Sequence, residues 1–464
     1  MRRGDETGRD PISKYARYRR FAKLMPAPNA PSTPSLRILV VGAGVGGISV
    51  ARGLLRDGHD VTVFEQRPDV TAGGGAVTIW SNGATVLAQL GVDMDRAGQL
   101  LSTVRVVTST GRPLATLDMT AIADRLGAPV RMVPRRVLLE RLLEGFPADR
   151  IRCNSRAVEV VSTHSGVRVE FEDGSSAEGD LLIGADGLHS MVRDIVGAQD
   201  AEPTGWCSWQ GLVTLPDAAD KHVALIVVGE HGSLGLWPAG GCDLQWWFDL
   251  PWSADFVRPK RPIDTIRSHF TGWSDLADRV LATLTDDDLA RSPFPHFRHP
   301  IARTPGQGAL TLLGDAAHTM PPTAAQGANQ ALLDTMVLCK ALSGFRIGMN
   351  SSNSDLSSAL RWYENTRRRK VKAVSWVASL QVSHRESVLR PAAMIPDRFM
   401  TWALTMFLRS VSHRRMSAKI SRNLGAAAST HLSPTAMKES PDTTPIDTSL
   451  PGVSAADHRF VEVR

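Results

Sequence analysis

The sequence of 464 residues contains little cysteine. Its four cysteines form no Cys-x-x-Cys pair and have no histidines at the spacing of a metal site. Closely spaced pairs of this kind are typical of zinc sites and of redox-active disulfides. The pattern therefore predicts no metal centre, and it predicts free thiols of the kind found in a reducing cytoplasm. The four are Cys153, Cys207, Cys242 and Cys339.

Long apolar runs are also missing. The best candidate, residues 399–408, is short and is flanked by Asp397, Arg398 and Arg409. A membrane-spanning helix needs about 20 consecutive apolar residues. We therefore expect residues 399–408 to form a packed amphipathic helix, with no attachment to a membrane.

Most of the chain carries almost no net charge, although the formal net charge of the whole sequence is +6. Residues 1–35 hold eight basic and three acidic side chains, so the other 429 residues carry a net charge of only +1. Because nucleic-acid phosphates are bound by a basic face, this distribution argues against a nucleic-acid partner. Residues 1–35 also lack the apolar segment of a secretory signal.

Composition and pattern divide the chain into segments. Prolines follow the basic start, and the end is rich in Ser, Thr and Pro, so both are expected to be disordered. Helix and strand patterns alternate over most of the remainder and are interrupted once by a series of short strands. We expect a basic disordered leader (1–35), an α/β domain in two pieces (36–200 and 296–385), an inserted antiparallel-sheet domain (201–295), a C-terminal helical segment (386–425) and a disordered tail (426–464).

A glycine-rich turn follows the first predicted strand. Residues 36–41 form a β-branched run, the motif Gly42-Ala43-Gly44-Val45-Gly46-Gly47 comes next, and a predicted helix leads to a second strand that ends at Glu65. In dinucleotide-binding folds, the glycines allow a tight turn, the approach of a pyrophosphate to the backbone, and close helix packing. The acidic residue binds a ribose hydroxyl. We therefore expect a dinucleotide site at Gly42, Gly44, Gly46, Gly47 and Glu65.

Two later buried strands also end in a glycine and an acidic residue. Residues 181–183 lead into Gly184-Ala185-Asp186-Gly187, and residues 310–313 lead into Gly314-Asp315-Ala316-Ala317-His318. A further helix is predicted to begin in Gln326-Gly327-Ala328-Asn329. The unpaired N–H groups at the start of that helix would suit an anionic or electron-rich ring.

The motifs that begin at Gly42, Gly184 and Gly314, in this order, resemble those of the single-component FAD-dependent monooxygenases, the para-hydroxybenzoate-hydroxylase-like group. The resemblance covers roughly residues 36–380. The Met320-Pro321-Pro322 sequence after His318 is similar to the tetracycline-inactivating branch. The resemblance implies a Rossmann-like FAD-binding domain interrupted by a substrate domain (201–295). It also implies a cytoplasmic enzyme that takes NADPH (or NADH) and O2 as co-substrates and hydroxylates a small molecule through a flavin C4a-hydroperoxide.

The resemblance also assigns residues to the cofactor. The adenosine end of FAD would lie at the turn from Gly42 to Glu65, with Asp315 near the pyrophosphate and ribityl chain. The flavin ring would lie by Pro321 and by Gly327, Ala328 and Asn329, and Asp186 would face the cofactor or the nicotinamide. An arginine in an Arg-x-x-Leu-x-x-x-Leu pattern would contact FAD. Both Arg135 and Arg136 fit that spacing, and the preceding Val133-Pro134 favours Arg135 as the helix start.

Tryptophan is concentrated in the inserted domain, which holds seven of the eleven. The adjacent Trp246 and Trp247 must point to opposite faces of a strand. A sheet that covers the flavin with indole rings would suit a flat, largely apolar or aromatic substrate, although tryptophans also suit a sheet face packed on a core. We expect the substrate pocket at Trp209, Trp237, Met320 and Pro321.

Tyrosine is nearly absent, since only Tyr15, Tyr18 and Tyr363 occur. The tyrosine relay that some members of this family use to deprotonate a phenol is therefore not available in the substrate domain. Any protein base would be a histidine, and no catalytic residue is assigned from the sequence. The candidate histidines in and just after that domain are His222, His231, His269, His296 and His299.

The sequence leaves two other functions to consider. A flavin-dependent halogenase would carry Trp-x-Trp-x-Ile-Pro, whereas residues 205–210 have a different spacing and no Ile-Pro. A non-catalytic FAD-binding scaffold would not need the Gly-Asp and Gln-Gly-Ala-Asn motifs. Hydroxylation is therefore the preferred hypothesis.

Overall fold

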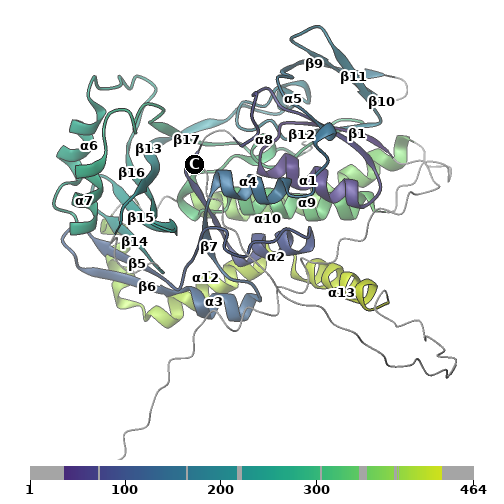
Figure 1. Ribbon diagram of the computed structural model, residues 1–464. Coiled ribbons are helices and arrows are strands. Elements are labelled where there is room, and N and C mark those ends of the chain that lie inside the picture. Colours follow the sequence, from purple (N-terminus) through teal and green to yellow (C-terminus); the bar gives the residue numbers. More distant parts are fainter. Residues whose placement is uncertain are drawn as a thin grey trace, which may run out of the picture.

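A computed structural model describes residues 36–430 of the protein, except for residues 72–73, 164–165, 217–221, 304–305, 344–352, 381–383 and 385. The predicted leader (1–35) and residues 431–464 of the predicted tail lie outside this part of the chain. The model shows a mixed α/β fold with a Rossmann-like parallel sheet, antiparallel sheets and C-terminal helices (Figure 1). The predicted fold class is confirmed.

The parallel sheet carries the motifs. Its five strands lie in the order β18–β12–β1–β2–β8. The central strand β1 is buried on both faces, which explains its uninterrupted apolar sequence. Because β1, β12 and β18 are neighbours, the motifs that follow them meet at one edge of the sheet. The strands are β1 (Arg37–Val41), β2 (Asp60–Phe64), β8 (Ile151–Arg152), β12 (Leu181–Gly184) and β18 (Leu310–Leu312).

Helices cover this sheet and share its core. The side chains of Ile48, Leu54, Leu332 and Leu338 are fully buried where α1 packs against α9. The helices of this lobe are α1 (Val45–Arg56), α2 (Ser81–Gln89), α4 (Arg135–Leu143), α5 (Met191–Ile195), α8 (Asp315–His318), α9 (Gly327–Leu342) and α10 (Asn353–Ser379), with short 3-10 turns η2 (Ala148–Arg150) and η3 (Pro322–Ala324). Helix α3 (Met119–Leu126) packs instead into the cluster on the inner side of the large antiparallel sheet.

Two small antiparallel sheets extend the lobe. One has the order β11–β10–β9, and the other has the order β3–β7–β4. The second one lies between the parallel sheet and the large antiparallel sheet, since β7 contacts β15 of the latter. The strands are β3 (Ala76–Ile79), β4 (Gln99–Leu100), β7 (Arg131–Pro134), β9 (Ala157–Thr163), β10 (Gly166–Phe171) and β11 (Ser176–Gly179).

The large sheet has seven strands in the order β17–β13–β16–β15–β14–β5–β6. It extends beyond the expected residues 201–295, because β5 pairs with β14 and brings β6 with it. That β5–β14 pair is parallel, and the other pairs are antiparallel. The strands are β5 (Thr103–Thr108), β6 (Pro113–Asp118), β13 (Glu202–Thr214), β14 (Val223–Val228), β15 (Ser233–Gly240), β16 (Asp243–Pro251) and β17 (Phe294–Arg298).

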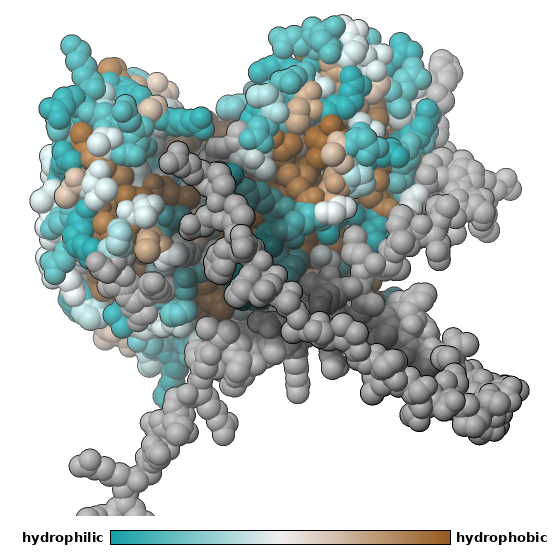
Figure 2. Space-filling model, in the orientation of Figure 1, coloured by the Kyte–Doolittle hydropathy of each residue, from teal (hydrophilic) through white to brown (hydrophobic). Residues whose placement is uncertain are grey.

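The large sheet has an outer and an inner face. Helices α6 (Pro262–Phe270) and α7 (Asp275–Thr283) cover the outer face. Pro262 occupies the first turn of α6, and Ser274 caps α7 by accepting the Ala277 N–H. The inner face is turned toward β3 and β7. Figure 2 shows the molecular surface hollowed between the lobe of the large sheet and the lobe of the parallel sheet.

The C-terminal part is helical, with α11 (Glu386–Leu389), the 3-10 turn η5 (Arg390–Met394), α12 (Asp397–Val411) and α13 (Arg414–Thr430). Helix α13 continues five residues past the predicted end of this segment at residue 425. Helix α12 packs on β6 and α3 and buries Thr401 and Thr405, while Phe399 and Trp402 are exposed. Among the described residues, no helix combines the length and the apolar character needed to cross a membrane.

Candidate active site

The turn after β1 requires glycine at two positions. Gly42 has a φ of 102°, and a Cβ atom there would lie 2.4 Å from the backbone oxygen of Ala185. A Cβ atom on Gly47 would lie 1.9 Å from the backbone oxygen of Gly42. Any side chain at these two positions would therefore separate α1 from the strands. The close approach also joins the first motif to the Gly-Ala-Asp-Gly motif after β12.

Gly44 and Gly46 face different surroundings. Gly44 borders open space, since the nearest atom to a Cβ built there is Nη2 of Arg135, at 3.8 Å. A Cβ on Gly46 would instead meet Leu313, at 2.5 Å, and Ala331. Gly44 thus presents the open side of the turn to a ligand, whereas Gly46 allows α1 to pack on β18 and α9.

The ambiguity between the two arginines is decided by their positions at the start of α4. Pro134 precedes the helix, and Arg135 is its first residue. The Arg135 side chain lies beside Gly44 and Gly74. The Arg136 side chain is 74% exposed and pairs with Glu140 at 2.8 Å. The structure therefore brings Arg135, and not Arg136, to the glycine turn.

Glu65 lies under the same turn. Its buried carboxylate accepts the Ala43 N–H at 2.9 Å and two N–H groups of Arg67, the backbone N–H at 3.0 Å and Nε at 2.9 Å. Burial alone would raise the pKa of Glu65, but the hydrogen bonds from Arg67 and Ala43 hold it below its usual value. An ionised acceptor at the end of β2 can hold the turn and bind a ribose hydroxyl.

Asp186 lies at the same edge but has local partners. Its carboxylate accepts the Ser190 hydroxyl at 2.5 Å and the Val192 N–H at 3.2 Å, so it holds the start of α5. Burial raises the pKa of Asp186. The structure therefore gives Asp186 a turn-stabilising role, and its contact with a cofactor stays a prediction.

Asp315 is the exposed carboxylate of the site. The backbone of Gly314 has φ 61° and ψ −137°, a conformation that glycine adopts readily, and it turns the chain from β18 into α8. Asp315 Oδ1 lies 3.8 Å from the position of a Cβ on Gly327, so the carboxylate is next to the start of α9. The N–H groups of Gly327, Ala328 and Asn329 have no partner within that helix.

The Asn329 side chain does not face this open edge. Its Oδ1 accepts the Trp80 N–H at 2.9 Å, and its Nδ2 donates to Thr78 O at 2.8 Å. Asn329 thus fixes the start of α9 against β3 and α2. Its backbone N–H, and not its amide, is available to a ligand.

A buried network missed by the sequence analysis holds the Gly-Asp motif from behind. Asp334 on α9 accepts from Gly314 N at 3.0 Å, contacts His318 Nε2 at 2.6 Å and pairs with Arg367 Nε at 2.5 Å. Burial alone would raise the pKa of Asp334, but His318 and Arg367 hold that pKa at about 2. His318 is therefore a structural partner of Asp334. No spacing rule could have identified Arg367, which lies in α10.

The inner face of the large sheet is opposite these motifs. Gln245 Oε1 accepts the Ala76 N–H at 2.5 Å, and Trp237 and Trp247 have ring centroids 5.7 Å apart. The Trp247 ring lies across Gly235, where any Cβ would come within 1.9 Å of it. Both indoles belong to the apolar cluster between the sheet and β7, where Trp237 is 5% exposed and Trp247 is half-buried.

Two of the expected substrate residues lie elsewhere. Trp209 alternates to the outer face of the sheet, where it is 1% exposed in the core under α6 and α7. Because Trp237 is on the inner face, the two tryptophans do not line one pocket. Met320 packs into the cluster of Val371 and Val374 on α10, and Pro321 is buried. The expectation for Trp209 and Met320 is corrected, because strand alternation and α10 turn them from the cleft.

Comparison with known proteins assigns the family. The model of a family described as "FAD binding domain" matches residues 35–376. The chain belongs to this family of FAD-dependent monooxygenases. It is 30% identical over 342 residues to an FAD-dependent urate hydroxylase of Klebsiella pneumoniae, covering 72% of this chain and 86% of the relative. It is 31% identical over 355 residues to 3-amino-4-hydroxybenzoate 2-monooxygenase of Streptomyces platensis, covering 73% and 85%.

Solved structures also match the fold of this chain. The structure of Klebsiella pneumoniae HpxO complexed with FAD and uric acid matches with a TM-score of 0.73 at 26% identity, covering 81% of this chain and 97% of that one. Tetracycline destructase Tet(55) matches with a TM-score of 0.63 at 18% identity, covering 82% and 97%, which shows the fold alone. The predicted enzyme class is confirmed.

The cradle of this monooxygenase fits FAD. The open side of Gly44 lies beside the Arg135 guanidinium, and the Asp315 carboxylate lies beside the start of α9; together they make up a row of candidate FAD contacts after β1 and β18. A pyrophosphate suits the first two groups, because one is a helix start and the other is a cation. A ribityl hydroxyl suits a carboxylate, and an electron-rich ring suits the helix start.

Replacing Arg135 with glutamine in this monooxygenase should weaken FAD binding by tenfold to a hundredfold, because a charge-assisted hydrogen bond contributes about 1.5–3 kcal/mol. Replacing Arg136 with glutamine is the matched control, since Arg136 is solvent-exposed. The FAD dissociation constant, measured by flavin fluorescence, checks both. Equal weakening in the two variants would contradict the placement of Arg135.

The candidate histidines separate by location. His231 and His269 are exposed, and His222 contacts Leu100 O at 3.0 Å. His299 Nδ1 accepts the Thr319 N–H at 3.2 Å, beside the Gly-Asp motif. His296 is buried on β17, 2.7 Å from the Ser208 hydroxyl. Of these five histidines, only His296 and His299 are therefore buried.

His296 belongs to a polar cluster that the sequence did not reveal. The buried carboxylate of Asp249 accepts the Ser208 hydroxyl at 2.5 Å and contacts His384 Nε2 at 3.0 Å. Burial would raise the pKa of Asp249, but His384, His296 and Ser208 hold it below its usual value. His384 is 135 residues away in the chain. The available signal was the position of Asp249 within the apolar run from Trp246 to Leu250.

Acidification should destabilise the protein through two of these histidines. Burial lowers the pKa of His296 and of His299 to about 4, below the usual 6.5. Between these values the unfolded chain binds more protons, so the free energy of unfolding falls as the pH is lowered from about 6.5 toward 4. Melting temperatures across this range test the prediction. His296→Gln should flatten the slope and the exposed control His269→Gln should not, whereas a flat wild-type profile would contradict it.

Proposed function

We propose that this protein is an NAD(P)H-consuming hydroxylase of a flat, largely apolar or aromatic small molecule. The observation that supports this most is the opposition of two surfaces. On one side is the row formed by Gly44, Arg135, Asp315 and the start of α9, and on the other is the inner sheet face with Trp237 and Trp247. A planar substrate would lie between the flavin end of that row and the indoles.

The relatives support the same substrate class. One is named for urate and another for 3-amino-4-hydroxybenzoate, and both compounds are planar rings with polar substituents. The substrate of this chain would share the planar ring. The inner face also carries a polar group at its rim, because Gln210 is exposed and lies on the same face as the buried Ser208, two residues before it.

When bound and reduced by NAD(P)H, FAD supplies the activation of O2 and the transfer of one oxygen atom. The chain's own residues bind, orient and shield. Arg135 neutralises the pyrophosphate, Asp315 orients the ribityl chain, and the N–H groups of Gly327 and Ala328 stabilise negative charge near the ring. Pro321 and Pro322 offer no N–H donor beside them.

Any proton transfer by the protein would use a neutral base. His299 lies beside Thr319, just after the Gly-Asp motif, but its Nδ1 already accepts the Thr319 N–H and its pKa of about 4 makes it a weak base at pH 7, so no protein base is assigned. Without a second glycine motif, NAD(P)H would bind transiently in the hollow between the lobes (Figure 2).

Oxidation of NAD(P)H in the presence of a panel of planar aromatic and heteroaromatic compounds tests the proposal. The holoprotein should oxidise NAD(P)H slowly alone and faster with a substrate, with formation of a hydroxylated product that carries one oxygen from labelled O2. Chloride or bromide incorporation, or oxidation that yields only hydrogen peroxide with every planar compound, would contradict it.

Two tryptophans on opposite faces provide a matched test of the substrate surface. Trp237→Phe changes the inner face and should raise KM or uncouple NAD(P)H oxidation from hydroxylation at a normal FAD content. Trp209→Ala changes the outer core and should lower stability by roughly 3–5 kcal/mol with coupling unchanged. Steady-state kinetics and thermal melts distinguish these effects. Unchanged KM and coupling in Trp237→Phe would remove Trp237 from the site.

A further inference from the structure

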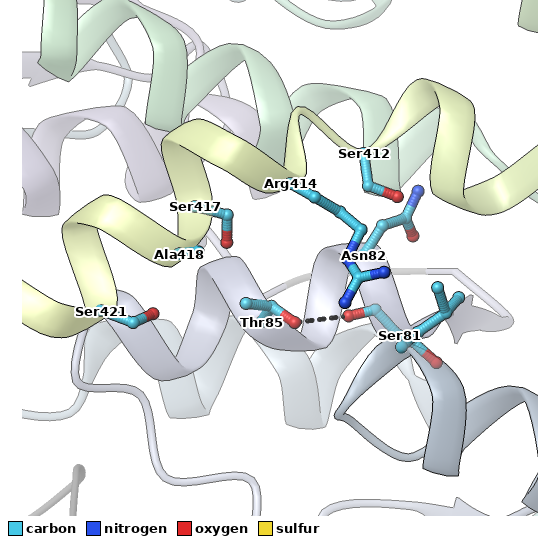
Figure 3. A pocket seen from close by; sticks show the side chains of 9 residues that line it. Ser81, Asn82, Thr85, Ser412, Arg414, Ser417, Ala418 and Ser421 are labelled. Atoms are coloured by element: carbon cyan, nitrogen blue, oxygen red, sulfur yellow. Dashed lines mark hydrogen bonds between the residues drawn. The ribbon is translucent and has the colours of Figure 1, made fainter.

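A polar pocket of about 140 Å³ lies between α2 and α13 (Figure 3). A water molecule takes about 30 Å³ in the liquid, so the pocket has room for a small polyatomic ligand. Polar side chains dominate its lining, and none of the lining residues is acidic. The lining residues are Ser81, Asn82, Thr85, Leu126, Ser412, Arg414, Ser417, Ala418 and Ser421.

Hydroxyl groups in the pocket have protons to donate. Gln89 Nε2 donates to both Ser417 Oγ and Ser421 Oγ, each at 2.9 Å. Because these two oxygens already accept, their O–H protons are left for another acceptor. The side chain of Ser81 is also buried, with the residue 1% exposed, and its hydroxyl has no partner among the described residues. A buried hydroxyl without a partner indicates a missing ligand or water.

Two other hydroxyls are already occupied. Thr85 Oγ1 donates to Ser81 O at 2.8 Å, the bond drawn in Figure 3, and Ser412 Oγ donates to Leu408 O. The hydroxyl groups that remain as donors for a ligand are therefore those of Ser81, Ser417 and Ser421. All three require an acceptor, and no carboxylate of the lining supplies one.

Positive charge converges on the same place. Helix α2 begins at Ser81 and α13 begins at Arg414, and neither carries an acidic residue in its first turn. The first N–H groups of each helix carry partial positive charge. Figure 3 shows Arg414 reaching from α13 toward Asn82 and Thr85 on α2. Within the part of the chain that the structure describes, no acidic side chain forms an ion pair with Arg414.

We propose that this pocket binds a small oxyanion, with phosphate and sulfate as the chemical class. A tetrahedral oxyanion offers several acceptors in different directions, which matches three hydroxyl donors and a guanidinium. Two helix starts add to the attraction for negative charge. The oxyanion is either a free inorganic ion or the phosphate group of a nucleotide.

Isothermal titration of the FAD-loaded full chain with sodium phosphate, against sodium chloride at equal ionic strength, tests the proposal. Wild type should bind one phosphate per chain in a saturable manner. Ser81→Ala and Arg414→Gln should each weaken that binding at least tenfold. The control Arg415→Gln, at an exposed neighbour outside the lining, should bind as wild type does. Circular dichroism and FAD content show whether each variant is folded.

Competition with adenosine 2′,5′-bisphosphate separates the two sources. Displacement of phosphate by the bisphosphate in wild type would assign the pocket to a nucleotide phosphate, and failure to displace would assign it to a free ion. Wild type that shows no saturable heat with phosphate beyond the chloride control would overturn the proposal. Wild-type affinity in both folded pocket variants would overturn it as well, because the ion would then bind elsewhere.

Discussion

Replacing Gly47 with alanine is expected to give a protein that retains no FAD and melts well below wild type. The added Cβ would lie 1.9 Å from the backbone oxygen of Gly42, a distance that no rotamer change can relieve. Either α1 moves from β1 or the turn opens, at a cost on the order of 3 kcal/mol or more. Absorbance of bound flavin and a thermal melt of the purified variant measure both effects.

Gly44→Ala is the matched comparison for that experiment. A Cβ at this position would meet only Arg135 Nη2, at 3.8 Å, so the polypeptide itself should tolerate it. The methyl group would fill the space that a pyrophosphate needs, so FAD affinity should fall while the melting temperature of the apoprotein stays near that of wild type. Full FAD retention in Gly44→Ala would show that the cofactor does not approach this turn.

Asp334→Asn is expected to lower the free energy of unfolding by about 3–5 kcal/mol, because it leaves the buried Arg367 guanidinium without its anionic partner. The same change weakens the anchor of Gly314 N and the contact to His318, so the Gly-Asp motif should hold FAD less firmly. Urea denaturation measures the loss. A change below about 1 kcal/mol would show that the network is not what holds this edge.

Asp315→Asn is the control for Asp334→Asn, because Asp315 lies on the exposed side of the Gly-Asp motif and Asp334 lies on its buried side. Asp315 is exposed beside Gly327, so its neutralisation should leave urea stability of the apoprotein unchanged and weaken FAD retention. The contribution of Asp334 to stability should also depend on pH. The pKa of Asp334 is about 2, so the stability from its ionised form is lost only as the pH falls below about 4 toward 2.

The cofactor half of the fold was predictable because its signals are local. Each of β1, β12 and β18 is a short apolar run that ends in glycine, and the placement of these strands as neighbours follows from the doubly wound order. The choice of Arg135 over Arg136 was also local, since Pro134 sets the first residue of α4.

The substrate half was less predictable because its determinants are long-range. Period-2 alternation separates Trp246 from Trp247, but it does not say which face meets the cofactor. Trp209 was therefore expected on the wrong face, and Met320 was expected at the cleft although α10 covers it. Asp249 with His384, and Asp334 with Arg367, are partners that no sequence motif links.

The flavin released from the purified protein tests the central claim most directly. We expect a yellow protein that, after denaturation, releases FAD and not FMN, at roughly one molecule per chain once loaded. Arg135→Gln should release less than Arg136→Gln from the same preparation. A colourless protein that takes up no added FAD, or one that carries FMN, would contradict the assignment of the Gly42 turn, Arg135 and Asp315 to a single dinucleotide.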